Sequence, residues 1–175
     1  MLFKGVGHHP KTGKKKGGIK VHTNIHANEG VLSDIKFTSA ATNDRFMLKP
    51  TNYIEGDIVA LDRAYIDYGK FEELTSRGVI NVTKMKKNLV YQVDVDTAYM
   101  TPEGLMEYRV KHVTFTKKVA EGSDIVHKAR ILTYVDIKKN KQAKLISLLT
   151  NDMEMPAEEI VAIYRKRWEI ELLFL

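Results

Sequence analysis

The residues that could do chemistry in this sequence begin with Asp62, which directly follows an unbroken apolar run from Ile58 to Leu61. Such a run is typical of an interior strand that is covered on both faces. Asp62 would then stand at the carboxyl end of a buried strand, where open α/β sheets gather their ligand-binding groups. The alternative is an aspartate that caps a turn, which is a common role for this residue type.

Glu171 is the second candidate, within the stretch YRKRWEIELLFL. On a helical wheel of about 100° per residue it shares one side with Ile160, Tyr164, Arg167 and Trp168. Burying an unpaired carboxylate costs roughly several kcal/mol, so this acid needs a compensating partner. Arg167, one turn earlier, could supply that partner as a structural ion pair.

Taken together, Asp62 and Glu171 are carboxylates from distant parts of the chain, one at a strand end and one on an apolar helix face. Mg²⁺ takes oxygen ligands from few side chains and keeps water and substrate phosphate for its other positions. The pair therefore indicates a hard-cation site for phosphoryl transfer. Tyr164 and Arg167, on the same helix stripe, could contact phosphate or support the glutamate.

Three further pairs give weaker signals: His8 with His9, His22 with His26, and Asp94 with Asp96. Neither histidine pair has the spacing of a specific metal site. The two aspartates share one face of an amphipathic strand, which indicates a solvated surface more simply than a catalytic pair. These residues stay outside the site hypothesis.

Composition favours one domain, because 175 residues that are 43% hydrophobic can form one proper core and are few for two. The absence of cysteine excludes disulfides and thiolate metal sites, and it fits a reducing cytoplasm. No apolar run is long enough to span a membrane, and the first residues lack the apolar core of a signal peptide. We therefore expect a soluble, cytoplasmic protein.

The formal charge of +6 is unevenly distributed along the chain. Residues 1–20 hold six lysines and no acid, and three of these lysines are consecutive: Lys14, Lys15 and Lys16. Residues 151–175 hold six acids against three bases. A basic arm beside carboxylates suits a polyanion held near an acidic metal site. A solvated tail is the alternative interpretation.

Strict alternation of apolar and polar residues predicts a half-buried strand over residues 19–27, with a hairpin to a second strand in VLSDIKFTS. Thr42 or Asn43 is expected to cap a short helix that Pro50 ends. After the strand that precedes Asp62, a helix is predicted from a cap at Asp67, with a second strand in VINVTKM. The helix should end near Ser76, with Gly78 as its stop.

Residues 88–136 show strand-like alternation with basic outward positions, which predicts a small meander inserted between two core elements. The segment AKLISLLT fits either a final strand or a helical turn. Pro156 suits the first position of a last helix, with Glu158 and Glu159 in the first turn, where the helix dipole favours acids.

Several ordered blocks of the sequence resemble the DDE transposases of bacterial insertion sequences. Two residues separate Tyr164 from Arg167 and three separate Arg167 from Glu171, which is the spacing of the tyrosine, arginine, glutamate, lysine signature of that family. The block LDRAYIDY is similar to the one around the family's second catalytic aspartate, which would be Asp62. KKKGGIKVH and the lead into the last helix, LLTNDMEMPAEEIVAIYRKRWEIELLF, also resemble family blocks.

The resemblance implies an α/β fold with a ribonuclease H-like mixed sheet, flanking helices and a β-rich insertion before the last helix. The expected organisation is a basic arm (1–18), a partial catalytic core (19–87 and 143–175) and an inserted β subdomain (88–142). In this family three carboxylates bind two Mg²⁺ or Mn²⁺ ions during DNA cleavage and strand transfer. By resemblance, Asp62 and Glu171 are catalytic metal ligands, and the partner is DNA at transposon ends.

The sequence also departs from the family pattern, because no acid precedes Glu29 where the first catalytic aspartate is expected, and the signature lysine would lie past Leu175. We therefore expect a piece or a truncated copy of a transposase without its first core strand. Such a chain should bind metal weakly and should not cleave DNA efficiently alone. The missing strand would leave sheet edges unpaired, which predicts a dimer or a rearranged sheet.

Two other functions remain open on the sequence. One is a non-catalytic DNA-binding module that uses the lysine cluster, with binding that depends on salt and not on metal. The other is a nonfunctional remnant that neither binds nor cleaves DNA.

Overall fold

The computed structural model describes residues 6–8, 15–26, 31–101, 104, 106–137 and 143–172, and it describes the side chains of residues 18–25, 34–101, 104, 106–137 and 143–167. Within these ranges the helices are α1 (Tyr68–Ser76) and α2 (Ala157–Leu172), with short 3₁₀ turns η1 (Asp44–Met47), η2 (Pro50–Asn52) and η3 (Arg63–Tyr65). No helix in the described ranges has the length and apolar character needed to cross a membrane.

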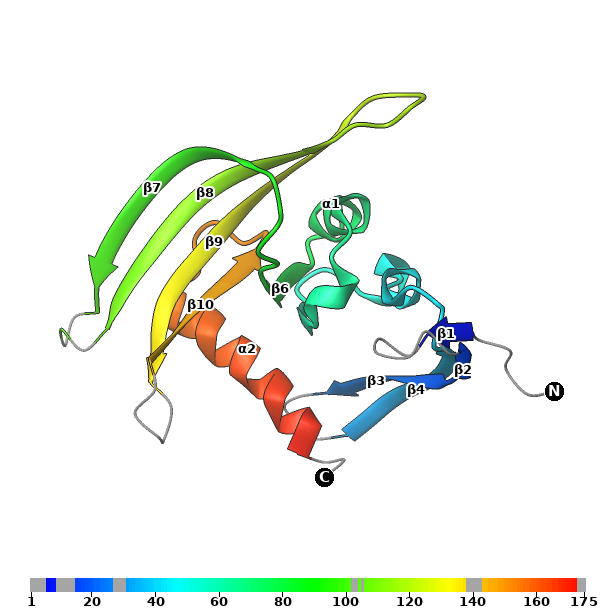
Figure 1. The fold of residues 1–175 in the computed structure, drawn as a ribbon. Coiled ribbons are helices and arrows are strands. Elements are labelled where there is room, and N and C mark those ends of the chain that lie inside the picture. Colours follow the sequence, from blue (N-terminus) through cyan, green and yellow to red (C-terminus); the bar gives the residue numbers. More distant parts are fainter. Residues whose placement is uncertain are drawn as a thin grey trace.

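The largest sheet is mixed and dominates the structure (Figure 1). Its strands are β5 (Ile58–Leu61), β6 (Ile80–Lys84), β7 (Gln92–Met100), β8 (Glu107–Lys117), β9 (Ile125–Ile137) and β10 (Ala143–Thr150). They lie in the order β5-β6-β10-β9-β8-β7, with β5 and β6 parallel and all other neighbours antiparallel. The predicted α/β class, a mixed sheet with flanking helices, is confirmed.

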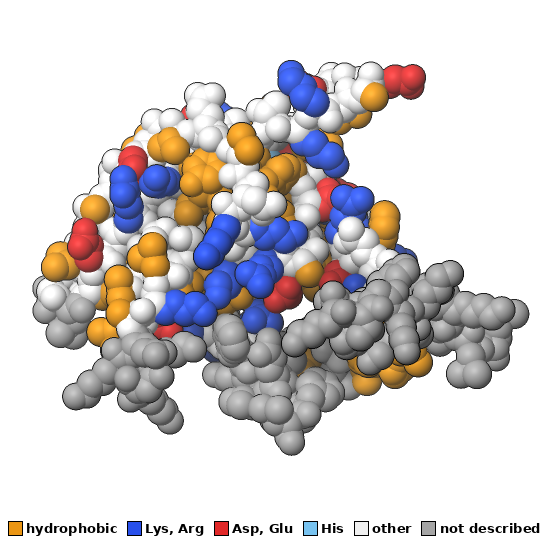
Figure 2. All heavy atoms as spheres, in the orientation of Figure 1, with side chains coloured by type: hydrophobic (Ala, Val, Ile, Leu, Met, Phe, Trp, Pro, Cys, Tyr) orange, Lys and Arg blue, Asp and Glu red, His pale blue; other side chains and the backbone are white. Residues whose placement is uncertain are grey.

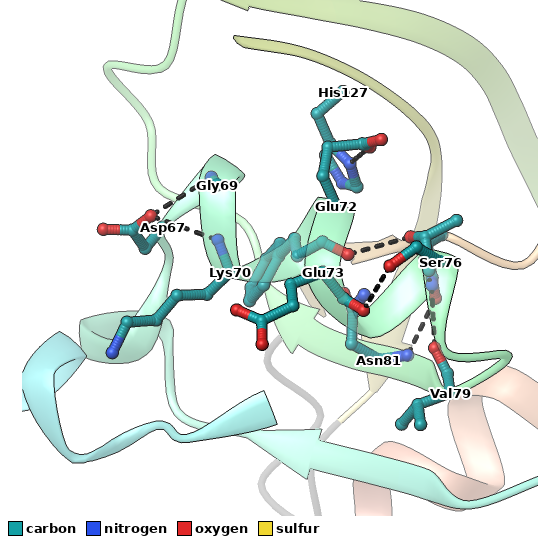
Figure 3. Close-up of polar contacts among 12 residues, drawn as sticks. Asp67, Gly69, Lys70, Glu72, Glu73, Ser76, Val79, Asn81 and His127 are labelled. Carbon is teal, nitrogen blue, oxygen red and sulfur yellow. Dashed lines mark hydrogen bonds and ion pairs between the residues drawn. The ribbon is translucent and has the colours of Figure 1, made fainter. Parts of the chain in front are cut away.

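The unit that carries Asp62 forms as its local signals predict. Helix α1 begins after Asp67, whose Oδ1 accepts hydrogen bonds from the backbone N–H groups of Gly69 and Lys70 at 3.1 and 3.3 Å (Figure 3). It ends before Gly78, which has a φ of +70°. Strand β6 then runs parallel to β5, with Ala60 opposite Val82. The strand, helix, strand prediction is confirmed, and it places Asp62 at the carboxyl end of a parallel strand.

The C-terminal elements resolve the ambiguity of AKLISLLT, which forms strand β10 between β6 and β9. Helix α2 follows, and the carbonyl of Pro156 accepts hydrogen bonds from the N–H groups of Glu159 and Ile160. The predicted meander is present as β7, β8 and β9, and it continues the same sheet through β10. An inserted subdomain with the boundaries 88–142 stays a prediction.

Two hydrophobic cores lie on opposite faces of the sheet. On β10, Leu149 belongs to the core under α1 with Phe71, while its neighbour Leu148 belongs to the core under α2 with Ile160. Successive residues of a strand point to opposite faces, so α1 and α2 sandwich the sheet. Both cores reach the parallel strands, through Leu61 on β5 and Val82 on β6. The backbone around Asp62 is therefore fixed from both sides.

Two separate hairpins lie outside this sheet: β1 (Val6–His8) with β2 (Lys15–Gly17), and β3 (Ile19–His26) with β4 (Val31–Ser39) (Figure 1). The hairpin that the sequence predicts, formed by β3 and β4, is thus confirmed. Its apolar face, however, is exposed rather than buried: Val21 and its cross-strand partner Phe37 are 55% and 58% exposed. The polar face contacts described residues near Asp62, because Lys20 hydrogen-bonds to Asp44 and His22 to Tyr65.

Among the described residues, some strand edges of these sheets are unpaired. Within the part of the chain that the structure describes, β5 pairs only with β6, and the β3–β4 hairpin pairs with no strand of the large sheet. An unpaired edge presents backbone donors and acceptors that another strand can bind.

Candidate active site

Asp62 takes the cap role that its position allows. It precedes the short turn η3, and its Oδ1 accepts a hydrogen bond from the backbone N–H of Ala64 at 2.9 Å. No described residue donates a hydrogen bond to the other oxygen, Oδ2. The cap interpretation is therefore correct for one carboxylate oxygen, while the second oxygen accepts no hydrogen bond from the described residues and could bind a ligand.

An open pocket of about 440 Å³ lies beside Asp62. Its walls come from segments that follow three strands: residues 41–44 after β4, residues 62–64 after β5, and Lys86 after β6. Lys20 of β3 completes the lining. The carboxyl ends of parallel strands are the edge where α/β sheets bind ligands, so the fold places this pocket where a site is expected.

The charged groups of the pocket are of two kinds. Lys20 is neutralised, because its Nζ lies 2.8 Å from Asp44 Oδ1 and also donates a hydrogen bond to the Thr42 carbonyl at 2.9 Å. Arg63 and Lys86 form no ion pair with any acid in the described part of the chain. These two cations were not predicted from the sequence, although each lies two residues past the last residue of a strand in the parallel pair.

Tyr65 connects the hairpin to this region. Its hydroxyl lies 2.7 Å from Nδ1 of His22, and Nε2 of the same ring lies 2.8 Å from the hydroxyl of Thr38. Burial, and then the charges of Asp44 and Asp62, raise the pKa of Tyr65 to about 12. The phenol therefore stays protonated at physiological pH and can donate to His22. This bridge positions β3 and β4 against the loop that carries Asp62.

Helix α2 carries the other predicted site residues. Tyr164 is 3% exposed and packs in the core between α2 and the sheet. The guanidinium of Arg167 lies 5.2 Å from the centre of the Tyr164 ring, a cation–π contact. The backbone of Glu171 belongs to α2, but its side chain lies outside the described residues. Convergence of Asp62 and Glu171 stays a prediction.

The lysine cluster is described only in part. Lys14 lies outside the described residues, and Lys15 and Lys16 belong to β2, paired with His8 and Gly7, with side chains outside the description. Their DNA-binding role therefore stays a prediction.

The aspartates of β7 form a solvated face, as predicted. Asp96 makes ion pairs with Arg109 at 2.7 Å and Lys111 at 3.5 Å, and Asp94 accepts a hydrogen bond from the Thr114 hydroxyl. The hydrogen bond from Arg109 is the main cause that lowers the pKa of Asp96.

A second polar cluster lies between α1 and β9 (Figure 3). The fully buried ring of His127 contacts the Glu72 carboxylate through Nδ1, while the side chain of Glu72 is 40% exposed. Tyr68 and Phe115 stack on the same ring. Burial is the main cause that lowers the pKa of His127, against the opposite effect of Glu72. This cluster holds α1 onto the sheet and does not line the pocket at Asp62.

The mixed sheet with helices on both faces is consistent with an α/β fold of the ribonuclease H type. The transposase DDE domain family matches residues 3–174, and the chain belongs to that family. It is also 27% identical over 157 residues to "Putative transposase y4zB" of Sinorhizobium fredii, a match that covers 90% of this chain and 43% of that protein. The chain thus spans less than half the length of this curated relative.

The family generally uses divalent metal ions. In the described part of the chain no group of three or more histidine or acidic side chains is arranged to hold a metal, and the Glu171 side chain is outside that search. Asp62 offers one carboxylate oxygen at the pocket, and Mg²⁺ can be held by one or two carboxylates when substrate phosphates supply further oxygens.

Proposed function

We propose that this chain is part of the catalytic domain of a transposase that cleaves DNA and transfers strands in a metal-dependent reaction at transposon ends. The observation that carries the proposal is Asp62, a strand-end carboxylate with one oxygen available, lining an open pocket that also contains cations. In the proposal Asp62 and Glu171 hold Mg²⁺ or Mn²⁺. The metal would activate the attacking hydroxyl and stabilise the leaving oxygen.

The chain's own residues have distinct roles in this proposal. Asp62 supplies an oxygen ligand while its capping bond to Ala64 fixes the carboxylate plane. Arg167, resting on the Tyr164 ring, orients Glu171 or contacts a DNA phosphate. Lys14, Lys15 and Lys16 contribute sequence-independent contacts to the DNA backbone. The core formed by residues 19–87 and 143–175 would carry the site, with the basic arm 1–18 and the insertion 88–142 as accessory parts.

Activity of this chain alone is expected to be low. No acid precedes Glu29, so the third carboxylate of the family is not supplied by the segment before the β3–β4 hairpin. We propose weak metal binding and no efficient DNA cleavage by this chain. Strand edges of β3, β4 and β5 that no described strand pairs favour self-association, and we propose a homodimer. The chain would act on bacterial DNA in the cytoplasm.

The test is a calorimetric titration of the chain with Mg²⁺ and with Mn²⁺, repeated on an Asp62→Asn, Glu171→Gln double variant. Asparagine caps turns as well as aspartate does, so the first substitution removes charge while it keeps the bond to Ala64. We expect weak binding to the unaltered chain and at least about tenfold weaker binding to the variant, which loses both proposed ligands. A Glu73→Gln, Glu107→Gln variant, in which two exposed acids outside the pocket lose the same charge, serves as the control.

Equal metal binding by the unaltered chain and the double variant would contradict the proposed site. Efficient Mg²⁺- or Mn²⁺-dependent nicking that Asp62→Asn abolishes would contradict the proposed inactivity and support the site.

A non-catalytic DNA-binding module is the second candidate, favoured by the two cations of the pocket that no described acid neutralises. Figure 2 shows Lys and Arg side chains gathered in the central part of one face, with few acids among them. This alternative is distinguished by DNA binding that is indifferent to metal and to substitution of Asp62.

A further inference from the structure

Several surface cations of the described chain are neutralised by ion pairs, whereas two cations that line the pocket at Asp62 are not. On the meander, Arg109 and Lys118 each contact a carboxylate, at 2.7 and 2.6 Å. On α2, Arg165 contacts Asp136 at 3.3 Å. In the pocket Lys20 is likewise paired, but Arg63 and Lys86 have no acidic partner among the described residues.

The charge of the pocket therefore suits an anion. The Lys20–Asp44 pair is neutral, and Arg63 and Lys86 outweigh the single carboxylate of Asp62. A divalent cation at Asp62 would increase the excess of positive charge. An anionic ligand beside Asp62 is the simplest way to balance it, because like charges that share a small site repel one another.

The fold holds these two cations at one edge. Arg63 begins η3 directly after β5, and Lys86 follows the end of β6 by two residues. Because β5 and β6 are adjacent parallel strands, their carboxyl ends lie roughly 5 Å apart at the same sheet edge. Arg63 is exposed and Lys86 half-buried, so both side chains can reach a ligand that lies over the pocket.

The lining also limits the kind of anion. It consists of charged, small and polar residues, and the described lining includes no aromatic ring on which a base could stack. The pocket is open rather than enclosed, which suits a chain passing over it better than a small free nucleotide. These features favour the phosphodiester backbone, which arginine contacts with two parallel N–H donors and lysine contacts as a point charge.

We propose that Arg63 and Lys86 bind backbone phosphate of the DNA strand that lies across Asp62, without reading its sequence. This inference rests on the proposed function, because it takes the DNA of that reaction as the ligand. It adds two binding residues that neither the family match nor the spacing of the signature residues identifies. Their contacts would position a phosphate beside the carboxylate that the proposed reaction needs.

The experiment measures binding of a fluorescent duplex of about 30 base pairs at several salt concentrations, in EDTA so that metal plays no part. The chain is compared with an Arg63→Gln, Lys86→Gln variant. Each phosphate contact contributes about 0.9 to the slope of log K against log salt, so one or two lost contacts should reduce the slope by about 0.9 to 1.8. At 100 mM salt, binding should weaken by roughly 10- to 60-fold.

Two controls make the result specific to the pocket. A Lys87→Gln, Lys128→Gln variant removes the same charge from exposed positions outside the lining, one of them next to Lys86. Its slope should change by less than about 0.5. An Arg63→Lys, Lys86→Arg variant keeps both charges and should retain most of the affinity. Equal affinity for a second duplex of unrelated sequence is expected, since phosphate contacts carry no base information.

An unchanged salt-dependence slope in the Arg63→Gln, Lys86→Gln variant would overturn the inference. An equal loss of DNA affinity in the Lys87→Gln, Lys128→Gln variant would overturn it too. Tighter binding of inorganic pyrophosphate than of the duplex, lost in the pocket variant, would also overturn it in favour of a small phosphate ligand. Failure here is distinguishable from failure of the proposed function, because the metal titration with the Asp62 and Glu171 variant contains no DNA. If the chain binds metal but the salt dependence of DNA binding is unchanged in the pocket variant, the proposed function is supported and the role of Arg63 and Lys86 is not.

Discussion

At the scale of single residues, Asp62 combines two roles that are often treated as exclusive. One carboxylate oxygen caps η3 through Ala64, while no described residue occupies the other. A cap fixes the orientation of the carboxylate before a ligand arrives, which reduces the ordering that binding requires. A structural role for one oxygen is thus compatible with, and useful for, a ligand-binding role for the other.

His127 leads to a prediction about the pH dependence of stability. Because its pKa in the folded chain is lowered from the ordinary 6.5, the unfolded chain binds the proton more readily. The free energy of unfolding should therefore be highest above pH 6.5 and fall as the pH drops below it, by about 1.4 kcal/mol for each unit of pKa difference. Neighbouring Tyr68, with a pKa raised to about 12, stays neutral throughout.

Urea unfolding at pH 8, 7, 6 and 5 measures this effect. His127→Phe, which keeps an aromatic ring beside Tyr68 and Phe115, should flatten the profile over this range. Glu72→Gln should steepen it, because the Glu72 charge raises the pKa of His127. The same profile in the His127→Phe variant as in the unaltered chain would contradict the assignment. Asp96 and Asp124, whose pKa values are lowered in the folded chain, cause a separate loss of unfolding free energy. That loss begins only as the pH falls to and below their ordinary pKa of 3.8.

At the scale of elements, Asn151 joins three of them through one side chain. Its Oδ1 accepts a hydrogen bond from the Asn81 N–H at 2.8 Å, and its Nδ2 donates to the Val79 carbonyl at 2.9 Å and the Thr75 hydroxyl at 2.8 Å. The side chain thus links the end of β10 to the end of α1 and the start of β6. Asn151→Ala should lower the free energy of unfolding by about 2–3 kcal/mol, because buried backbone groups lose their partners.

Urea denaturation of Asn151→Ala beside Ser76→Ala checks this prediction. Ser76 is exposed and its hydroxyl bonds only within α1, to the Glu73 carbonyl, so its loss should cost less than about 0.5 kcal/mol. Equal stability of the two variants would mean that the Asn151 bridge contributes little to holding β10 and α1 together.

Elements with local signals could be predicted from the sequence, and features that depend on packing could not. The cap at Asp67, the stop at Gly78 and the strand before Asp62 are encoded within a few residues. By contrast, alternation in β3 identifies two faces but does not say which one meets the rest of the chain. In the structure Val21 and Phe37 on the apolar face are exposed, because hydrogen bonds of Lys20 and His22 turn the polar face toward residues distant in sequence.

The same limit applies to the site. Asp62 could be identified because the residues before it are a local pattern, whereas Arg63 and Lys86 acquire meaning only when β5 and β6 are known to be adjacent. The rule that ligands gather at the carboxyl ends of parallel strands, applied to both strands of the predicted unit, would have suggested both cations.

At the scale of the whole molecule, the β3–β4 hairpin combines an exposed apolar face with strand edges that pair with no strand of the large sheet in the described chain. Ile19, Val21, Ile35 and Phe37 on that face are 43–58% exposed. Apolar surface of this kind and open edges both favour association. We therefore expect a dimer whose population rises with concentration in sedimentation velocity. The substitutions Val21→Thr and Phe37→Thr together should weaken dimer affinity at least about tenfold, because burying each apolar side chain contributes roughly 1.5–3 kcal/mol.

The control for this prediction is an Ile54→Thr, Val90→Thr variant, which removes two apolar side chains that are 71% and 88% exposed but lie outside the hairpin. Its association should match that of the unaltered chain if the hairpin face is the interface. A monomer at every concentration would show that the open edges and the apolar face do not drive pairing. Equal weakening by both double variants would instead indicate nonspecific association, because only a defined interface depends on where the apolar side chains lie.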